Sequence, residues 1–206
     1  MEPFTAVTGV AAPLMRQNVD TDVIIRIERI NLGRRNLEPY CFEPWRYLPD
    51  GRSDPGFLLN QPPYDQARIL LNAANFGCGS SREAAVWALQ CIGIRCVVAP
   101  SFGEIFQTNC FQNGVLPIIL PPETVGEMAE EARKSPDAAF TVDLDTTMIT
   151  LPSGREIAFS IDPGRREMLL RGLDEIGLTI QRESAIANYQ ARDRAARPWI
   201  YDVGNR

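Results

Sequence analysis

The sequence contains no histidine in its 206 residues. This absence excludes a serine–histidine nucleophile, a histidine general base and histidine ligands to a metal ion. Any proton transfer by this chain therefore has to use serine, cysteine, tyrosine, lysine or a carboxylate.

Cysteine is also scarce, and its spacing is irregular. The five cysteines are Cys41, Cys78, Cys91, Cys96 and Cys110. The odd count and the lack of a Cys-x-x-Cys pair argue against a disulfide framework, and they give little support to a metal or iron–sulfur site within the chain. Cys78 lies inside a glycine-rich turn and is the one cysteine that a substrate could contact, with a packing role as the alternative.

Long apolar runs are missing as well. No stretch of about 18 apolar residues occurs, so the sequence predicts no membrane span. Residues 1–4 lack the basic start and the apolar stretch of a signal peptide, and we therefore expect a cytoplasmic protein. No internal repeat or low-complexity tract is present.

Basic residues are fewer than acidic residues. The chain has 21 basic and 26 acidic residues, a net charge of −5, which argues against a general nucleic-acid binder. Local arginines would have to attract a dicarboxylate substrate, because the overall field repels it. The length and the 45% hydrophobic content suit a single domain over residues 1–206.

The order of apolar segments predicts an α/β domain. Strands are expected at residues 4–10, 67–75, 93–99, 115–120, 140–144, 148–151 and 156–161. Helices are expected at residues 84–92, 104–111, 123–134, 164–171 and 184–196, with a capping-box pattern at 101–104. Pro117 favours an edge or irregular position for its strand. Residues 23–30 suit either a strand or a short helix, and residues 31–63 are expected to carry short helical pieces.

The chain is organised around residues 75–89, between an apolar strand and an apolar helix. Gly77 and Gly79 allow positive φ angles and a close approach of the backbone to a ligand. The free N–H groups at the start of the next helix favour an anion there. The alternative is a capping box, in which Ser80 only caps the helix and Glu83 is its partner.

Several spaced motifs resemble one protein family. They are Asn-Phe-Gly-Cys-Gly-Ser-Ser-Arg-Glu at 75–83, Asn-Val-Asp-Thr-Asp at 18–22 and Ala-Pro-Ser-Phe at 99–102, with further matches at 105–106, 109–111, 113–114, 116–117 and 172–179. Together they resemble the small subunit of 3-isopropylmalate dehydratase, which is similar to the swivelling domain of aconitase. The matches run from residue 10 to residue 189 and imply a three-layer β/β/α swivelling fold.

The resemblance implies hydro-lyase chemistry. Such a small subunit interconverts 2-isopropylmalate and 3-isopropylmalate by dehydration and rehydration, in leucine biosynthesis, and is expected to be inactive alone. The family's Lewis acid is a [4Fe–4S] cluster on the large subunit, so no cofactor or metal is expected on this chain. The implied partners are that large subunit and a small dicarboxylate, without nucleic acid or membrane.

The resemblance also assigns roles to residues in the two turns. Ser80 occupies the position of the aconitase base, and Ser81 is expected to give a supporting hydrogen bond to the substrate or the helix cap. Arg82 is the expected ligand of a substrate carboxylate, with a surface ion pair as the alternative. Asp22 is expected to orient an arginine or a water, with a plain Asx-turn as the alternative.

Further turn and loop positions complete the expected site. Thr21 and Gly79 are expected to border the substrate, although Asp20 and Thr21 also suit a role as turn formers. A carboxylate-binding arginine follows the first turn in aconitase, and the candidates here are Arg26, Arg29, Arg34 and Arg35. We favour Arg29, with Arg26 second.

The sequence departs from the family pattern at two places. The histidine that often follows the Ser-Arg-Glu motif is replaced by Ala84, and residues 26–30 differ from the usual proline- and lysine-bearing segment. The second change affects the segment expected to face the variable group of the substrate. The alternatives are therefore a related subunit acting on methylated malates such as dimethylmalate or citramalate, and a non-catalytic anion-binding module.

Overall fold

The computed structural model of the chain describes residues 1–34, 36–80 and 82–201. The chain divides into two compact units, Met1–Gly172 and Leu173–Arg206. The first unit contains the sheet and both turns of the predicted site. The assignment of residues 1–206 to a single domain stays a prediction.

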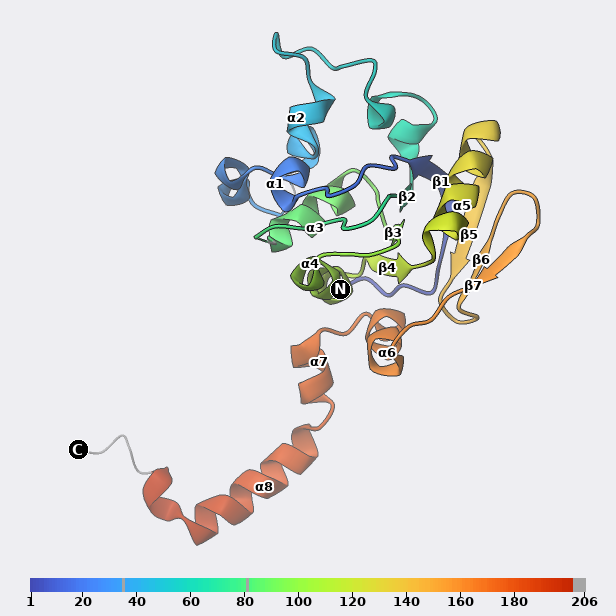
Figure 1. Ribbon diagram of the computed structural model, residues 1–206. Coiled ribbons are helices and arrows are strands. Elements are labelled where there is room, and N and C mark those ends of the chain that lie inside the picture. The colour runs from blue at the N-terminus through green and yellow to red at the C-terminus, as the bar shows by residue number, and fades with distance from the viewer. Residues whose placement is uncertain (35, 81, 202–206) are drawn as a thin grey trace. The chain divides into compact units, whose positions relative to one another are not determined.

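The first unit is built on a seven-stranded mixed sheet in the order β4-β3-β2-β1-β5-β6-β7 (Figure 1). The strands are β1 Ala6–Pro13, β2 Ile69–Leu71, β3 Cys96–Ala99, β4 Leu116–Ile119, β5 Ala139–Asp143, β6 Met148–Thr150 and β7 Glu156–Ala158. β1 to β4 are parallel, with Ala11 opposite Ile69 and Ile69 opposite Cys96. β5 to β7 are antiparallel. The predicted α/β class is confirmed.

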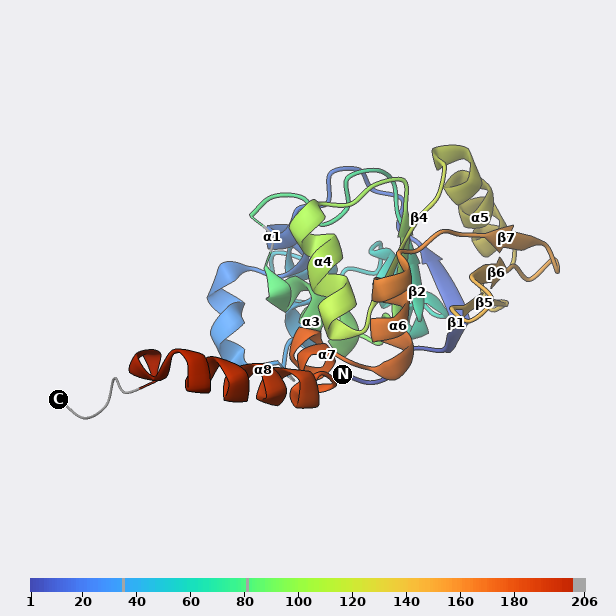
Figure 2. The same ribbon diagram turned by 90° about the horizontal axis from the view of Figure 1, so that it is seen from below.

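Helices cover the parallel strands on both faces. In this unit they are α1 Thr21–Ile24, α2 Glu43–Arg46, α3 Glu83–Cys91, α4 Glu104–Asn113, α5 Pro122–Lys134 and α6 Pro163–Arg171. α4 contacts both α3 and α6 (Figure 2). Two hydrophobic cores lie on opposite faces of the sheet. Leu70 belongs to the core under α3 and α4. Ile69 and Leu71 belong to the core under α5, which also contains residues of β5 to β7. Burial on both faces explains why the strand segments are apolar without alternation.

Pro117 lies in β4, at one edge of the sheet, as predicted. An edge strand leaves one side of its backbone unpaired, so a residue without an N–H group is tolerated there. The strand predicted at residues 67–75 is shorter than expected, because the chain leaves the sheet after Leu71 and forms the loop before α3.

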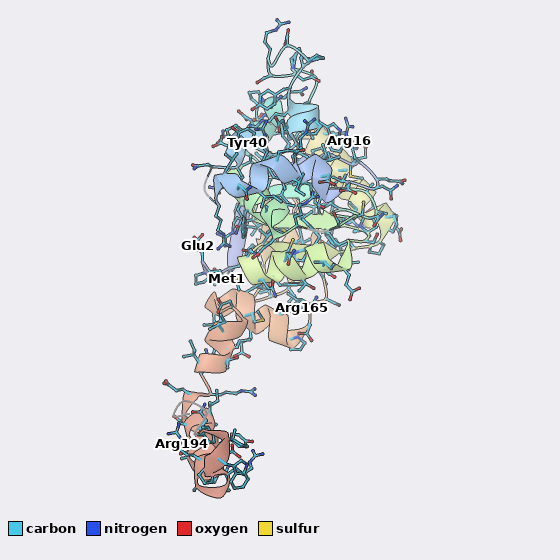
Figure 3. The ribbon with its side chains drawn as sticks, turned by 90° about the vertical axis from the view of Figure 1, so that its left-hand side faces the viewer. Met1, Glu2, Arg16, Tyr40, Arg165 and Arg194 are labelled. Carbon is cyan, nitrogen blue, oxygen red and sulfur yellow. The ribbon has the colours of Figure 1, made fainter. Side chains whose placement is uncertain are left out.

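The long segment between β1 and β2 carries short helices, as predicted. Besides α1 and α2 it holds the 3₁₀ helices Ile27–Leu32, Glu38–Tyr40, Leu58–Asn60 and Tyr64–Gln66. Phe42 and Phe57 are buried and contact Trp45, so these aromatic rings fix the segment to the core. Arg16 stacks on Trp45, with its guanidinium carbon 4.3 Å from the ring centroid. Figure 3 shows Arg16 and Tyr40 at the end of this unit away from Met1 and Arg165.

The second unit is helical and has no buried residue among those described. It contains α7 Glu175–Ile180, α8 Glu183–Ala196 and the 3₁₀ helix Pro198–Ile200. The helix predicted at residues 184–196 is therefore present, whereas the short α7 is not among the helices expected from the sequence. No helix in the described part of the chain has both the length and the apolar character to cross a membrane.

Candidate functional site

The candidate site forms where loops meet at the carboxyl ends of β1 and β2. Gly77 and Cys78 both donate backbone N–H groups to the Val19 carbonyl, over 2.8 and 3.1 Å. The Thr21 N–H donates in return to the Cys78 carbonyl, over 3.0 Å. These bonds hold residues 18–22 against residues 77–80. Carboxyl ends of parallel strands are the usual position of ligand sites in open α/β sheets.

The loop after β3 closes the site from the other side. The Asn75 N–H donates to Ser101 Oγ over 2.8 Å, and the Gly103 N–H donates to the Phe76 carbonyl over 2.9 Å. Phe76 also makes an edge-to-face contact with Phe102, at a centroid distance of 6.4 Å. Hydrogen bonds thus join the three loops, and the contact between the two phenylalanine rings supports them.

The two glycines of the central turn are required by close packing. Gly77 has φ +71°, and a Cβ atom there would lie 2.2 Å from the Phe106 side chain. Gly79 has φ +85°, and a Cβ atom there would lie 2.2 Å from the Asp20 carboxylate. The expected positive φ angles are confirmed. The expected close approach of this backbone to a ligand stays a prediction.

We predict that Gly77→Ala lowers the free energy of unfolding by about 2–4 kcal/mol, because it adds both left-handed strain and a clash with Phe106. Urea unfolding of the chain measures the loss. Gly51→Ala is the matched control, since Gly51 has φ +83° but open space around its Cβ position. Equal losses in both variants would show that the Phe106 contact contributes nothing.

The start of α3 is not capped as the sequence predicts. α3 begins at Glu83, its N-cap residue is Arg82, and no described side chain bonds the free N–H groups of the first turn. Ser80 is exposed, and its hydroxyl has no hydrogen-bond partner among the described residues. The Glu83 carboxylate accepts a hydrogen bond from Asn113 Nδ2 instead, over 2.9 Å. The capping-box alternative for Ser80 and Glu83 is therefore wrong.

The second capping-box prediction fails in the same way. α4 begins at Glu104 with Gly103 as its N-cap residue and no side-chain cap. The Ser101 hydroxyl is used by the Asn75 N–H, which ties the β3 loop to the central turn. At the start of both helices, hydrogen bonds to distant segments take the place of the capping box that the local sequence predicts.

Arg82 and Asp22 form an ion pair across the two turns. The Arg82 side chain is 16% exposed and the Asp22 side chain 54% exposed, so the pair lies at the rim of the site with the guanidinium on the inner side. α1 and α3 lie beside each other at this point (Figure 1). The surface ion pair considered for Arg82 is thus present, and Asp22 lies where it can orient this arginine.

The neighbouring predicted residues differ in exposure. Gly79 is exposed beside Ser80, whereas Thr21 is fully buried and its hydroxyl has no partner among the described residues. Asp20 caps α1, and its carboxylate accepts from the Asp22 N–H over 2.7 Å. Ser81 and Arg35, two predicted positions, lie outside the described residues.

Arg29, the arginine favoured above for binding a substrate carboxylate, already binds the carboxylate of Glu43. Its guanidinium donates to Glu43 from Nε over 3.2 Å and from Nη2 over 2.8 Å, and it stacks on Tyr40 with 4.4 Å between Cζ and the ring centroid. The hydrogen bond raises the pKa of Arg29 and lowers the pKa of Glu43. A substrate would have to displace a carboxylate to reach this side chain.

The other two described arginines of this segment have different surroundings. Arg34 donates to Asn113 Oδ1 and lies over Trp87, with 5.2 Å between Cζ and the ring centroid. The Arg26 side chain makes no hydrogen bond or ion pair within the described residues, but its charge helps to lower the pKa of Glu43. It lines a groove of about 660 Å³ together with Tyr40 and other residues of the same segment. Sequence spacing could not distinguish these arginines, because the partners of Arg34 come from distant segments.

Four of the five cysteines have a raised thiol pKa. Cys41, Cys96 and Cys110 are buried, and burial raises the pKa of each. Burial also raises the pKa of Cys78, and the Asp20 carboxylate raises it further. In residues 1–34, 36–80 and 82–201, no group of three or more cysteine, aspartate or glutamate side chains is placed to hold a metal ion.

Family models account for most of the chain. The aconitase C-terminal domain matches residues 1–123, and the LeuD_N model matches residues 127–163. The model for the C-terminal domain of the 3-isopropylmalate dehydratase small subunit matches residues 175–203. The three models match successive parts of the chain.

Individual relatives agree with the family models. The chain is 51% identical over 201 residues to the 3-isopropylmalate dehydratase small subunit of Paramagnetospirillum magneticum, covering 97% of this chain and 100% of that one. It is 50% identical over 200 residues to the protein of that name from Gluconacetobacter diazotrophicus, covering 97% of each. A crystal structure of 3-isopropylmalate dehydratase from Methanocaldococcus jannaschii matches 89% of this chain and 99% of its own, with a TM-score of 0.63 and 25% identity. The chain therefore belongs to the family of 3-isopropylmalate dehydratase small subunits and has the fold of the aconitase C-terminal domain.

Proposed function

We propose that this chain, with a large subunit, interconverts 2-isopropylmalate and 3-isopropylmalate by removing and re-adding water, in the cytoplasm and in leucine biosynthesis. The observation that carries the proposal is the uncapped start of α3. Ser80 is exposed there, the first-turn N–H groups have no described side-chain partner, and Arg82 is held beside them by Asp22. These groups suit a substrate that carries a carboxylate next to the carbon that loses a proton.

Ser80 is the proposed base. A free serine hydroxyl is a very weak acid, so its alkoxide requires strong stabilisation. The N–H groups at the start of α3 and the guanidinium of Arg82 supply partial and full positive charge close to this position. Cys78 is the poorer candidate, because burial and the Asp20 carboxylate raise its pKa and disfavour its thiolate. Ser80 is exposed and lies close in sequence to Arg82, whose positive charge favours an alkoxide.

Arg82 is the proposed ligand of a substrate carboxylate. Its guanidinium has five donors, and the ion pair with Asp22 leaves some of them for a second anion. The inner position of the guanidinium strengthens its attraction for a carboxylate once the large subunit excludes water. In this proposal Asp22 orients Arg82, and Ser81 and Gly79 border the substrate. Thr21 is fully buried and instead holds the turn, through its N–H bond to the Cys78 carbonyl.

Arg26 is the stronger proposal for a second carboxylate ligand. Arg29 would first have to give up Glu43 and its stacking on Tyr40. Arg26 is exposed and lies just after α1, and it interacts with Glu43 through its charge, without a hydrogen bond or ion pair among the described residues. Arg29 then serves to hold the groove beside Arg26 in shape.

Expulsion of the substrate hydroxyl requires a Lewis acid. The described residues offer no ligand set for one, and the buried thiols resist the deprotonation that metal binding requires. A small subunit of a heteromeric dehydratase implies a large-subunit partner. We assign a [4Fe–4S] cluster to that partner, where it supplies the Lewis acid.

The proposal is tested by mixing this chain with a reconstituted iron–sulfur large subunit under anaerobic conditions. Absorbance of the unsaturated diacid is followed with 3-isopropylmalate, dimethylmalate and citramalate as substrates. We expect 3-isopropylmalate to give the highest kcat/KM. Turnover of a methylated malate alone would replace the substrate assignment, and no turnover with a formed cluster would favour the non-catalytic anion-binding module.

A further inference from the structure

Asn113, at the end of α4, uses the full hydrogen-bonding capacity of its side-chain amide. Nδ2 donates to Glu83 Oε1 and to the Asn109 carbonyl, over 2.9 Å each. Oδ1 accepts from Trp87 Nε1 over 2.9 Å and from Arg34. An amide has two donor hydrogens and two acceptor lone pairs, so every position is filled. The residue is 3% exposed, which makes each of these bonds costly to lose.

The bond to Glu83 determines what this carboxylate can do. Glu83 is the first residue of α3, where the free N–H groups and the dipole of the helix start attract a carboxylate. Asn113 holds it on the side of the helix that faces α4 instead. In the first turn the Ala85 N–H donates to the Arg82 carbonyl over 3.0 Å, whereas the Glu83 and Ala84 N–H groups have no partner among the described residues.

We infer that Asn113 is a positioning residue for the substrate site, which keeps Glu83 away from the start of α3 so that these N–H groups can receive the substrate carboxylate. The inference rests on the proposed function. It also assigns a role to Arg34, which balances the charge of Glu83 through the amide of Asn113 rather than binding substrate. Trp87 fixes the orientation of the amide, because its N–H can only donate.

The decisive variant is Asn113→Asp in the full chain assembled with its large subunit. The new carboxylate keeps the bonds from Trp87 and Arg34, loses the bond to the Asn109 carbonyl and faces the Glu83 carboxylate, so Glu83 is driven towards the start of α3. The substrate then loses a charge-assisted hydrogen bond to these N–H groups. We therefore expect the KM for the dicarboxylate to be about tenfold higher at pH 8, with kcat within about twofold of wild type.

The pH profile gives a signature that a merely structural role lacks. Two facing carboxylates share one proton, so the pair has a raised pKa. As the pH falls towards 6, the shared proton restores a hydrogen bond between them, and KM is expected to return towards the wild-type value. Arg34 is the charged group that faces this pair, and it limits the rise in pKa.

Two further variants complete the test. Glu83→Gln combined with Asn113→Asp keeps the net charge and reverses the hydrogen bond, so KM is expected within about threefold of wild type at pH 8. Gln90→Met is the matched control, because Gln90 Nε2 also bonds Asn113, at its backbone carbonyl over 2.5 Å, without touching Glu83. It should lower stability and leave KM unchanged.

A readout without turnover separates this inference from the proposed function. In the full chain, the amide resonance of Ala84 is expected to shift in Asn113→Asp and to return in the swapped double variant, because the released carboxylate bonds this N–H group. The Ala85 N–H already donates to the Arg82 carbonyl and serves as an internal reference. An unchanged Ala84 amide resonance, or a KM rise that the swap does not reverse, would overturn the inference. Lack of turnover by the wild-type enzyme would overturn the proposed function, while the Ala84 amide resonance would still decide the position of Glu83.

Discussion

Ser80→Ala is expected to lower kcat of the assembled enzyme by about 10³–10⁴-fold, with little change in KM. The variant removes the proposed base and leaves the carboxylate ligands in place. Single-turnover formation of the unsaturated diacid measures the effect directly. Because Ser80 is exposed and caps nothing among the described residues, the free energy of unfolding should change by less than about 0.5 kcal/mol.

Ser101→Ala is the matched control for this serine. Its hydroxyl accepts the Asn75 N–H over 2.8 Å and ties two loops of the site together. The loss of that bond should cost about 1 kcal/mol of stability while retaining most of kcat. If Ser80→Ala loses no more activity than Ser101→Ala, Ser80 is not the base.

Arg82→Gln is expected to lower kcat/KM by about 10²–10³-fold, mainly through a higher KM. The substitution removes the cation that binds the substrate carboxylate and frees the Asp22 carboxylate to repel it. Initial rates over a range of substrate concentrations separate the two constants. Stability should change little, because ion pairs with one partner more than half exposed contribute weakly.

Two variants distinguish binding from a simple ion pair. Arg82→Lys keeps the charge but loses the two-pronged geometry, so we expect an intermediate loss. Asp22→Asn removes the partner and keeps the guanidinium, and it should lower kcat/KM by about tenfold or less. A larger loss in Asp22→Asn than in Arg82→Gln would show that Asp22, rather than Arg82, contacts the substrate.

The sequence predicts most of the sheet and its helices, because those segments are long or strongly apolar. The strand at β3, the edge position of Pro117 and the short helices between β1 and β2 are all confirmed. The family resemblance is confirmed by the family models and by relatives at about half identity. These features depend on local pattern, or on motifs that stand in a fixed order.

The failures have a common cause in contacts between distant residues. The capping box at Ser80 and Glu83 is favoured locally, but Asn113, 30 residues beyond Glu83, takes the Glu83 carboxylate. Likewise, the spacing of the arginines does not reveal that Arg29 binds Glu43, 14 residues away in sequence. The role of Arg29 towards a substrate stays a prediction. Local propensity is a weak guide where a tertiary partner offers a better bond.

We propose that this chain supplies the catalytic base of an active site whose Lewis acid lies on another subunit. The most direct test is a competition in which a fixed amount of iron–sulfur large subunit receives wild-type and Ser80→Ala chains in varying proportion. We predict no turnover of 3-isopropylmalate by either subunit alone, and a rate that falls with the fraction of the variant chain. Turnover by the large subunit alone, or an undiminished rate when the variant chain replaces the wild type, would contradict the claim.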